Sequence, residues 1–180
     1  MCLFKRGGGH CNPVFIHDNV LYYLSWSINA WNLNTGEQLF RHVFTRDVPV
    51  PKTYSATNSL QPVYCKGKIY YTSGECYSTI ESYRNIHCID AATGRLVWNA
   101  IAKKSESMNT NPIIAHDKLY VSQGSGLRVY NPENGELLGV DKSFCGMAMS
   151  RNVLYKDYMI CIRMTSKTGY GRLVAVDVSK

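Results

Sequence analysis

Residues 88–98 read CIDAATGRLVW, and this stretch contains the features that decide the fold. A β-forming run ends near Asp90, a turn follows that closes with Gly94, and a second apolar run ends at Trp98. Gly94 supplies the positive φ that a tight turn between two strands requires. The stretch is therefore predicted to be a β-hairpin.

Two other stretches have the same pattern. Residues 30–40 read AWNLNTGEQLF and residues 129–135 read VYNPENG, with glycine again closing the turn. An Asp or Asn before the turn has a side-chain oxygen that accepts hydrogen bonds from turn amides. The hairpin of residues 88–98 is thus predicted to occur at least three times along the chain.

Each of these hairpins is preceded by another. Two short β-rich runs separated by a turn residue occur at residues 13–22, 62–71 and 112–120, with a weaker copy at 152–160. The key turn residues are Asp18, Gly67, Asp117 and Asp157. Each copy therefore contains two hairpins, or four strands.

A period of 40 to 50 residues with four short strands per copy and no convincing amphipathic helix is typical of a β-propeller. We predict an all-β chain with four four-stranded blades in a single domain, residues 1–180. The expected blades are 13–44, 62–102, 112–144 and 152–180, the last completed by an N-terminal strand at residues 1–6.

The motif of residues 88–98 resembles the tryptophan-docking repeat of the PQQ-like propeller family, found in quinoprotein dehydrogenases and in the outer-membrane assembly propeller. The resemblance implies a structural docking role for Phe40, Asp90, Gly94 and Trp98, with the ring at the end of each blade packing between blades. The third copy departs from the pattern, because Gly139 stands where the ring belongs.

The closure of the ring has three alternatives. The segment Cys2–Lys5 aligns with Gln38–Arg41, which predicts a strand that pairs near residues 174–178. Two such chains would form an eight-bladed dimeric ring without exposed strand edges. This homodimer is favoured over a closed four-blade monomer, and a fragment of a longer propeller is the third alternative.

Composition narrows the functional classes. The chain has a net charge of +7 and only 18% charged residues, which excludes disorder and favours an anionic partner over a cationic one. No apolar run reaches the ~18 residues of a membrane span, and residues 1–10 do not resemble a signal peptide. We therefore expect a cytoplasmic protein whose seven cysteines are reduced thiols.

The sequence contains no recognisable catalytic constellation, and we expect no enzymatic activity, no cofactor and no metal. His10-Cys11 and His87-Cys88 lack the spacing of zinc knuckles, and His87-Cys88 is assigned to a strand. The adjacent cysteines and the acidic calcium loop that the resemblance to quinoprotein dehydrogenases would imply are also missing.

Candidate binding residues are sorted by the end of the blade at which they lie. His17, Lys66, His116 and Lys156 are predicted at one equivalent position of the first turn, either as a cationic cluster or as solvated residues. The long connections at the other end carry ten basic and five acidic residues, together with tyrosines typical of interfaces. The candidate partner-binding residues there are Arg46, Lys52, Tyr54, Tyr83, Arg84, Lys103, Lys104, Arg163, Lys167 and Tyr170.

Two functional classes follow from this basic, Tyr-containing loop face. The first is a non-enzymatic binding or assembly scaffold that recruits a protein partner. The second is a propeller that binds nucleic acid or another anionic ligand through phosphate contacts and aromatic stacking. The dependence of binding on ionic strength separates the two.

Overall fold

The computed structural model describes residues 14–24, 27–43, 61–73, 85–101, 111–123, 126–142, 152–164 and 171–179. Within these ranges the chain forms fifteen β-strands joined by turns, with no helix. The prediction of an all-β protein is confirmed for this part of the chain.

The strands form four antiparallel sheets. The first sheet contains β1 (Val14–His17), β2 (Val20–Leu24), β3 (Ser27–Asn32) and β4 (Gln38–Val43). The second contains β5 (Val63–Cys65), β6 (Lys68–Ser73), β7 (Asn85–Asp90) and β8 (Leu96–Ile101). The third contains β9 (Ile113–Ala115), β10 (Lys118–Gln123), β11 (Gly126–Tyr130) and β12 (Leu137–Asp141). The fourth contains β13 (Val153–Tyr155), β14 (Tyr158–Met164) and β15 (Gly171–Asp177).

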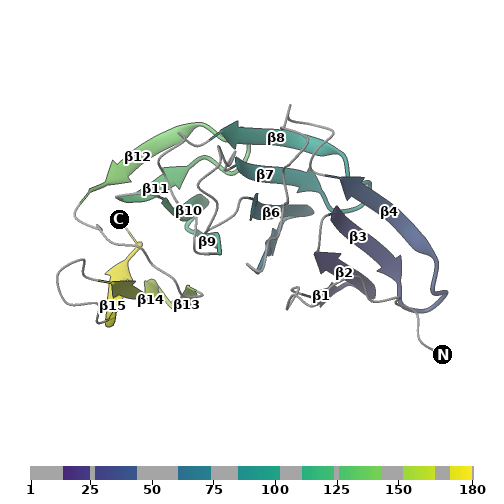
Figure 1. The fold of residues 1–180 in the computed structure, drawn as a ribbon, viewed down its shortest axis with the longest axis horizontal. Helices are drawn as coiled ribbons and strands as arrows, with labels where there is room; N and C mark the ends of the chain where they lie inside the picture. Colours follow the sequence, from purple (N-terminus) through teal and green to yellow (C-terminus); the bar gives the residue numbers. More distant parts are fainter. Residues whose placement is uncertain are drawn as a thin grey trace.

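In every sheet the strands neighbour one another in chain order. The fourth sheet has three described strands, and the strand predicted at residues 1–6 to complete it lies outside the described residues. Figure 1 shows the sheets following one another along an arch, with β4, β8 and β12 on its outer side. The first and fourth sheets lie apart at the two ends of this arch (Figure 1).

The turn between the first two strands of each sheet is two residues long. In the first sheet it consists of Asp18 and Asn19, both with positive φ, and His17 pairs with Val20 as the last residue of β1. Lys66 is the first turn residue of the second sheet, and the equivalent first turn residue of the first sheet is therefore Asp18. The prediction that His17 shares the position of Lys66, His116 and Lys156 is wrong, because the first copy has one more residue before its turn.

The sheet order separates two kinds of connection. The tight turn after the first strand of each sheet and the turn after the third strand of the first three sheets lie at one end of the sheets, which we call the turn face. The connections from β2 to β3 and from one sheet to the next leave the opposite strand ends, which we call the loop face. At the loop face the structure describes the strand ends and a few residues next to them, such as Asn111 and Asn152, while most of each connection lies outside the described residues.

Apolar side chains fill each seam between consecutive sheets. One cluster joins the first and second sheets and includes Tyr22, Ile28, Ile69, Tyr71 and Ile89. A second joins the second and third sheets and includes Tyr70, Ile86, Cys88, Trp98 and Leu119. A third joins the third and fourth sheets and includes Ile113, Tyr120, Leu127, Met159 and Cys161. The core is thus a series of similar seams, each made by alternate residues of two neighbouring sheets.

Candidate functional site

Trp98 lies at the seam between the second and third sheets. Its indole nitrogen donates a 2.8 Å hydrogen bond to the carbonyl oxygen of Pro132, in the turn that joins β11 to β12. The ring also covers Gly135, where a β-carbon would lie 2.5 Å from Cε3 of Trp98. The Trp98 ring of the second sheet therefore packs against the turn between β11 and β12 of the third sheet.

Phe40 makes the same kind of contact one seam earlier. A β-carbon at Gly94 would lie 2.3 Å from Cδ2 of Phe40, so this glycine allows both a positive φ and close approach of the ring. Asp90 holds the turn in shape by accepting hydrogen bonds from the Thr93 hydroxyl and amide, both at 2.7 Å, and from the amide of Ala92 at 3.1 Å. These bonds, the one from the Thr93 hydroxyl foremost, lower the pKa of the Asp90 carboxyl.

The seam between the third and fourth sheets is built differently, because Gly139 of β12 has no ring to contribute. The hydroxyl of Tyr120 donates to the carbonyl oxygen of Val178 at 3.0 Å, as the equivalent Tyr22 donates to Ala91 at 3.2 Å at the first seam. Asn111 and Asn152 bond to each other, with the amide of Asn152 donating to Oδ1 of Asn111 at 2.6 Å. Both asparagines are buried. This seam thus lacks a docked ring and has a buried asparagine pair in addition to the tyrosine hydrogen bond that it shares with the first seam.

Ion pairs connect neighbouring turns on the turn face. Nζ of Lys66 lies 2.6 Å from the carboxylate of Asp117, and Nε2 of His116 lies 2.8 Å from the carboxylate of Asp157. In both pairs the first turn residue of one sheet meets the second turn residue of the next. The pair raises the pKa of Lys66 and lowers the pKa of Asp117, chiefly through the hydrogen bond between them.

These contacts support neither of the two interpretations of Lys66 and His116 on the turn face. Lys66 and His116 are neither a cationic cluster for a ligand nor only solvated, because each has an acidic partner on the next sheet. His17 packs its ring 3.7 Å from that of Tyr64, measured between centroids, and so also contacts the following sheet. Lys156 lies 5.6 Å from the centroid of the Tyr155 ring on its own sheet.

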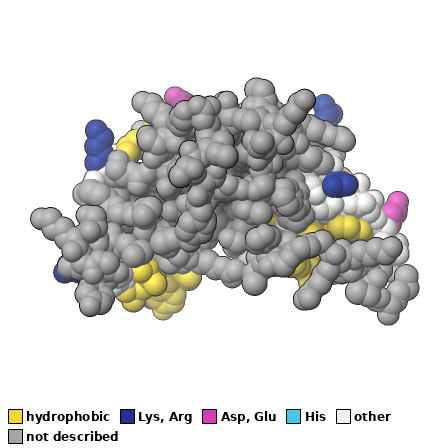
Figure 2. Space-filling view, viewed as in Figure 1, with side chains coloured by type: hydrophobic (Ala, Val, Ile, Leu, Met, Phe, Trp, Pro, Cys, Tyr) yellow, Lys and Arg dark blue, Asp and Glu magenta, His cyan; other side chains and the backbone are white. Residues whose placement is uncertain are grey.

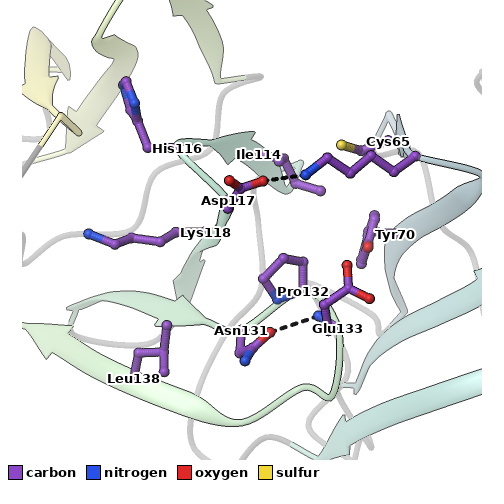
Figure 3. A pocket seen from close by; sticks show the side chains of 11 residues that line it. Cys65, Tyr70, Ile114, His116, Asp117, Lys118, Asn131, Pro132, Glu133 and Leu138 are labelled. Atoms are coloured by element: carbon purple, nitrogen blue, oxygen red, sulfur yellow. Dashed lines mark hydrogen bonds and ion pairs between the residues drawn. The ribbon is translucent and has the colours of Figure 1, made fainter.

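A pocket of about 400 Å³ opens on the turn face between the second and third sheets. Figure 3 shows Tyr70, Ile114 and Pro132 around it. Lys66 and Asp117, which form an ion pair, also line it. A further ion pair, between Lys68 and Glu133, lies next to it. Because these charges are balanced within the protein, the pocket is a seam between sheets rather than a site built for a charged ligand.

Two histidines lie buried between the first and second sheets, toward the loop face. The rings of His87 and Tyr71 are stacked at 4.7 Å between centroids, and His42 of β4 is also buried. Burial, with a smaller contribution from the nearby His42, lowers the pKa of His87 to about 3. His87 lies on β7, as predicted, whereas its proximity to His42 is not predictable from the local sequence, because only the packing of two sheets creates it.

The candidate partner-binding residues lie almost entirely outside the described residues. Arg163 is part of β14, but its side chain is not described, and the other nine lie in the connections of the loop face. Neither their grouping nor their separation is therefore given by the structure, and their role stays a prediction.

Other site types can be checked in the described part of the chain. No group of three or more His, Cys, Asp or Glu side chains there is arranged to hold a metal ion. No helix among these residues is long and apolar enough to cross a membrane. The buried thiol of Cys88 has its pKa raised to about 12 by desolvation, which makes it a poor nucleophile at neutral pH.

Comparison with known proteins identifies the fold. No protein-family model matches the sequence, and no curated protein matches it either. Similar solved structures include BamB from Moraxella catarrhalis, with a TM-score of 0.57 and 15% identity over 88% of this chain. Quinohemoprotein alcohol dehydrogenase from Comamonas testosteroni has a TM-score of 0.64 and 12% identity over 93% of this chain. The WD40 repeats of RRP9 have a TM-score of 0.62 and 10% identity over 96% of this chain.

The chain has a β-propeller fold. The likeness to both BamB and a quinohemoprotein dehydrogenase agrees with the expected PQQ-like repeat, although identities of this size establish the fold alone. The chain spans 46% of the BamB chain, 32% of the dehydrogenase and 55% of the RRP9 repeats. Four sheets thus correspond to a part of each of these larger proteins.

Proposed function

We propose that this chain is a non-enzymatic binding scaffold that presents its basic, Tyr-containing loop face to a protein partner. The observation that carries the proposal is the asymmetry between the two ends of the sheets. On the turn face the described ion-pair charges are balanced by neighbouring sheets, whereas the connections of the loop face and the strand ends next to them carry ten basic and five acidic residues.

The fold fits this role. The chain has the same fold as part of BamB and of the WD40 repeats of RRP9, and loops on a rigid scaffold of sheets are common binding sites. Tyr and Arg residues in such loops are enriched in the energetically dominant part of protein interfaces. Tyr54, Tyr83 and Tyr170 would supply the aromatic contacts, beside basic residues such as Arg84 and Lys167.

We further propose that two chains close one eight-bladed ring, so that the loop face is present twice around a common axis. A closed ring leaves no apolar end face exposed, which favours this arrangement over a single open arch. We place the assembled protein in the cytoplasm, where its thiols stay reduced.

The test compares two double variants with the same net charge. Lys103→Ala with Lys104→Ala removes two charges from a loop-face connection, and Lys66→Ala with Arg95→Ala removes two exposed charges from the turn face. Partners captured from a lysate by the full chain are identified, purified, and titrated against the wild-type chain and both variants. We expect the loop-face variant to bind at least tenfold more weakly and the turn-face variant to bind as the wild type does.

Ionic strength then separates the two functional classes. Docking to a protein should survive nuclease treatment and change modestly between 50 and 200 mM salt. A loss of roughly 10³-fold or more over that range, together with release by nuclease, would assign the loop face to nucleic acid instead. Equal weakening by both variants would overturn the loop-face proposal.

A further inference from the structure

The fourth sheet has one apolar face that no other described sheet covers. Met159 and Cys161 of β14 pack against the third sheet, so the alternate residues of that strand face away from it. The large apolar side chains that are exposed on the fourth sheet's outer side are Val153, Tyr155, Tyr158, Ile162 and Leu173. Leu173 has 76% of its surface exposed.

The equivalent positions of the other three sheets are buried. Leu173 lies four residues before Asp177, as Ile28, Ile86 and Leu127 lie four residues before the turn Asn or Asp of their own sheets. Those three side chains are 0%, 0% and 3% exposed, because each packs against the following sheet. The outer face of the fourth sheet thus has the apolar composition of a surface that packs against a following sheet, but no described sheet covers it.

The first sheet has the complementary apolar surface, of the kind that packs against a preceding sheet. The second sheet packs against the first through Ile69, Tyr71 and Ile89. The strand registers place Leu21, Tyr23 and Trp31 at the equivalent positions of the first sheet. On this same side Ile16 is 62% exposed and Leu33 is 41% exposed. These residues form a receiving face with no preceding sheet among the described residues.

The two unmatched faces lie at the two ends of the arch. Figure 1 shows the first and fourth sheets at opposite ends, with the other two between them. Figure 2 shows apolar side chains gathered over β13–β15 at one end, and a second group near β1 and β2 at the other. Within this arch the two faces do not meet, although each has the apolar composition that the other would require.

We infer that a second copy of this chain covers both faces, with the fourth sheet of each copy packed on the first sheet of the other. This inference rests on the proposed two-chain ring and names the surfaces that would form it. A twofold axis makes the two junctions identical, so the assembly closes and no end face stays open. The new junction continues the three seams already present within the chain.

The turn face adds charge complementarity to the apolar match. At two seams the first turn residue of one sheet pairs with the second turn residue of the next, as in Lys66 with Asp117. At the new junction the same rule brings Lys156 of one copy to Asn19 of the other, next to Asp18. Asp18 is 86% exposed and its described ion pair is to the adjacent His17, so it can also attract Lys156.

The first experiment places a charge on the exposed face. Leu173→Glu should leave the fold of one chain intact, since the side chain is largely exposed there, but it would bury two carboxylates in the dimer. Val97→Glu is the matched control, because Val97 is 45% exposed on β8 of the second sheet, away from both ends. Sedimentation velocity should show a dimer for the wild type and the control and a monomer for Leu173→Glu, with unchanged far-UV circular dichroism in all three.

The second experiment tests the register of the junction. Asn19→Asp creates at this junction the pairing seen twice within the chain, and should tighten the dimer by about 2- to 30-fold over its two junctions. Lys156→Glu should weaken the dimer, and adding Asn19→Lys to it should restore association. Nonspecific association through an exposed apolar surface would not respond to a charge exchange in this way.

The outcomes separate this inference from the proposed loop-face function. A wild-type chain that stays monomeric at high micromolar concentration, or a Leu173→Glu variant that dimerises as the wild type does, overturns the two-copy junction. Partner binding through the loop-face residues is measured independently of mass. A monomer that still loses its partner on loop-face substitution would retain the binding proposal and discard the ring.

Discussion

Gly135 is the position at which the docking of one sheet on the next can be tested most sharply. It has a φ of +75°, and a β-carbon there would lie 2.5 Å from the Trp98 ring. An Ala in the left-handed region costs roughly 1–2 kcal/mol. Forcing a methyl group into a packed contact costs roughly 1–3 kcal/mol more. We expect Gly135→Ala to lower the free energy of unfolding by about 2–5 kcal/mol.

Gly67 provides a control with the same backbone strain and no clash. Its φ is +74°, and no atom lies within 4 Å of a β-carbon built there. Gly67→Ala should therefore cost only the roughly 1–2 kcal/mol of the left-handed conformation. The difference between the two variants, about 1–3 kcal/mol, isolates the contact with the ring and corresponds to roughly 2–12 °C in Tm.

A double-mutant cycle completes this test. Trp98→Ala alone should cost roughly 3–5 kcal/mol, because it removes a large buried ring. In that background Gly135→Ala no longer meets a ring, so its additional cost should fall to that of Gly67→Ala. Urea denaturation followed by circular dichroism gives all the required values. Equal costs for the two glycine variants, or an excess cost of Gly135→Ala that persists without the ring, would refute the docking of Trp98 on this turn.

Three further predictions follow from the buried groups and from the chain start. Burial holds His87 neutral, so the unfolded chain binds a proton more readily, and stability should fall by about 1.4 kcal/mol per pH unit from about pH 6.5 down toward pH 3. His87→Phe should flatten this dependence in urea titrations at pH 7 and pH 5, and an unchanged slope would contradict the burial of the imidazole. In the folded protein an alkylating reagent should modify the half-buried Cys65 faster than the fully buried Cys88, as peptide mass spectrometry would show; equal rates would contradict the packing of Cys88. Deletion of residues 1–6 should cause aggregation or loss of the fold if they complete the last sheet, and a soluble variant with unchanged Tm and mass would exclude that role.

The local parts of the fold could be predicted from the sequence. Alternating apolar residues and turn residues mark hairpins within about ten residues, and the pattern that ends at Gly94 marks a turn whose Asp90 accepts the turn amides. The first copy shows the limit of this approach. A shared proline and apolar pattern aligned His17 with Lys66, whereas the positive φ values of Asp18 and Asn19 decide where the turn lies.

Contacts between sheets could not be predicted in the same way. The pairing of Lys66 with Asp117 joins residues 51 positions apart, and no local pattern indicates that neighbouring turns come within 2.6 Å. The facing of His87 and His42 likewise depends on how two sheets pack. Gly135 was expected only to permit a turn, but it also provides the space that the Trp98 ring occupies. Such relations require the spatial order of the sheets.

Small-angle X-ray scattering of the unmodified chain tests most directly whether the arch is half of a ring. A two-chain ring predicts a mass near 41 kDa, twice the 20.3 kDa of one chain. Its radius of gyration should be about 21 Å or slightly more, as for a compact particle of that size. A mass near 20 kDa with a radius of gyration of about 16 Å, unchanged on raising the concentration, would contradict the pairing of the two end faces.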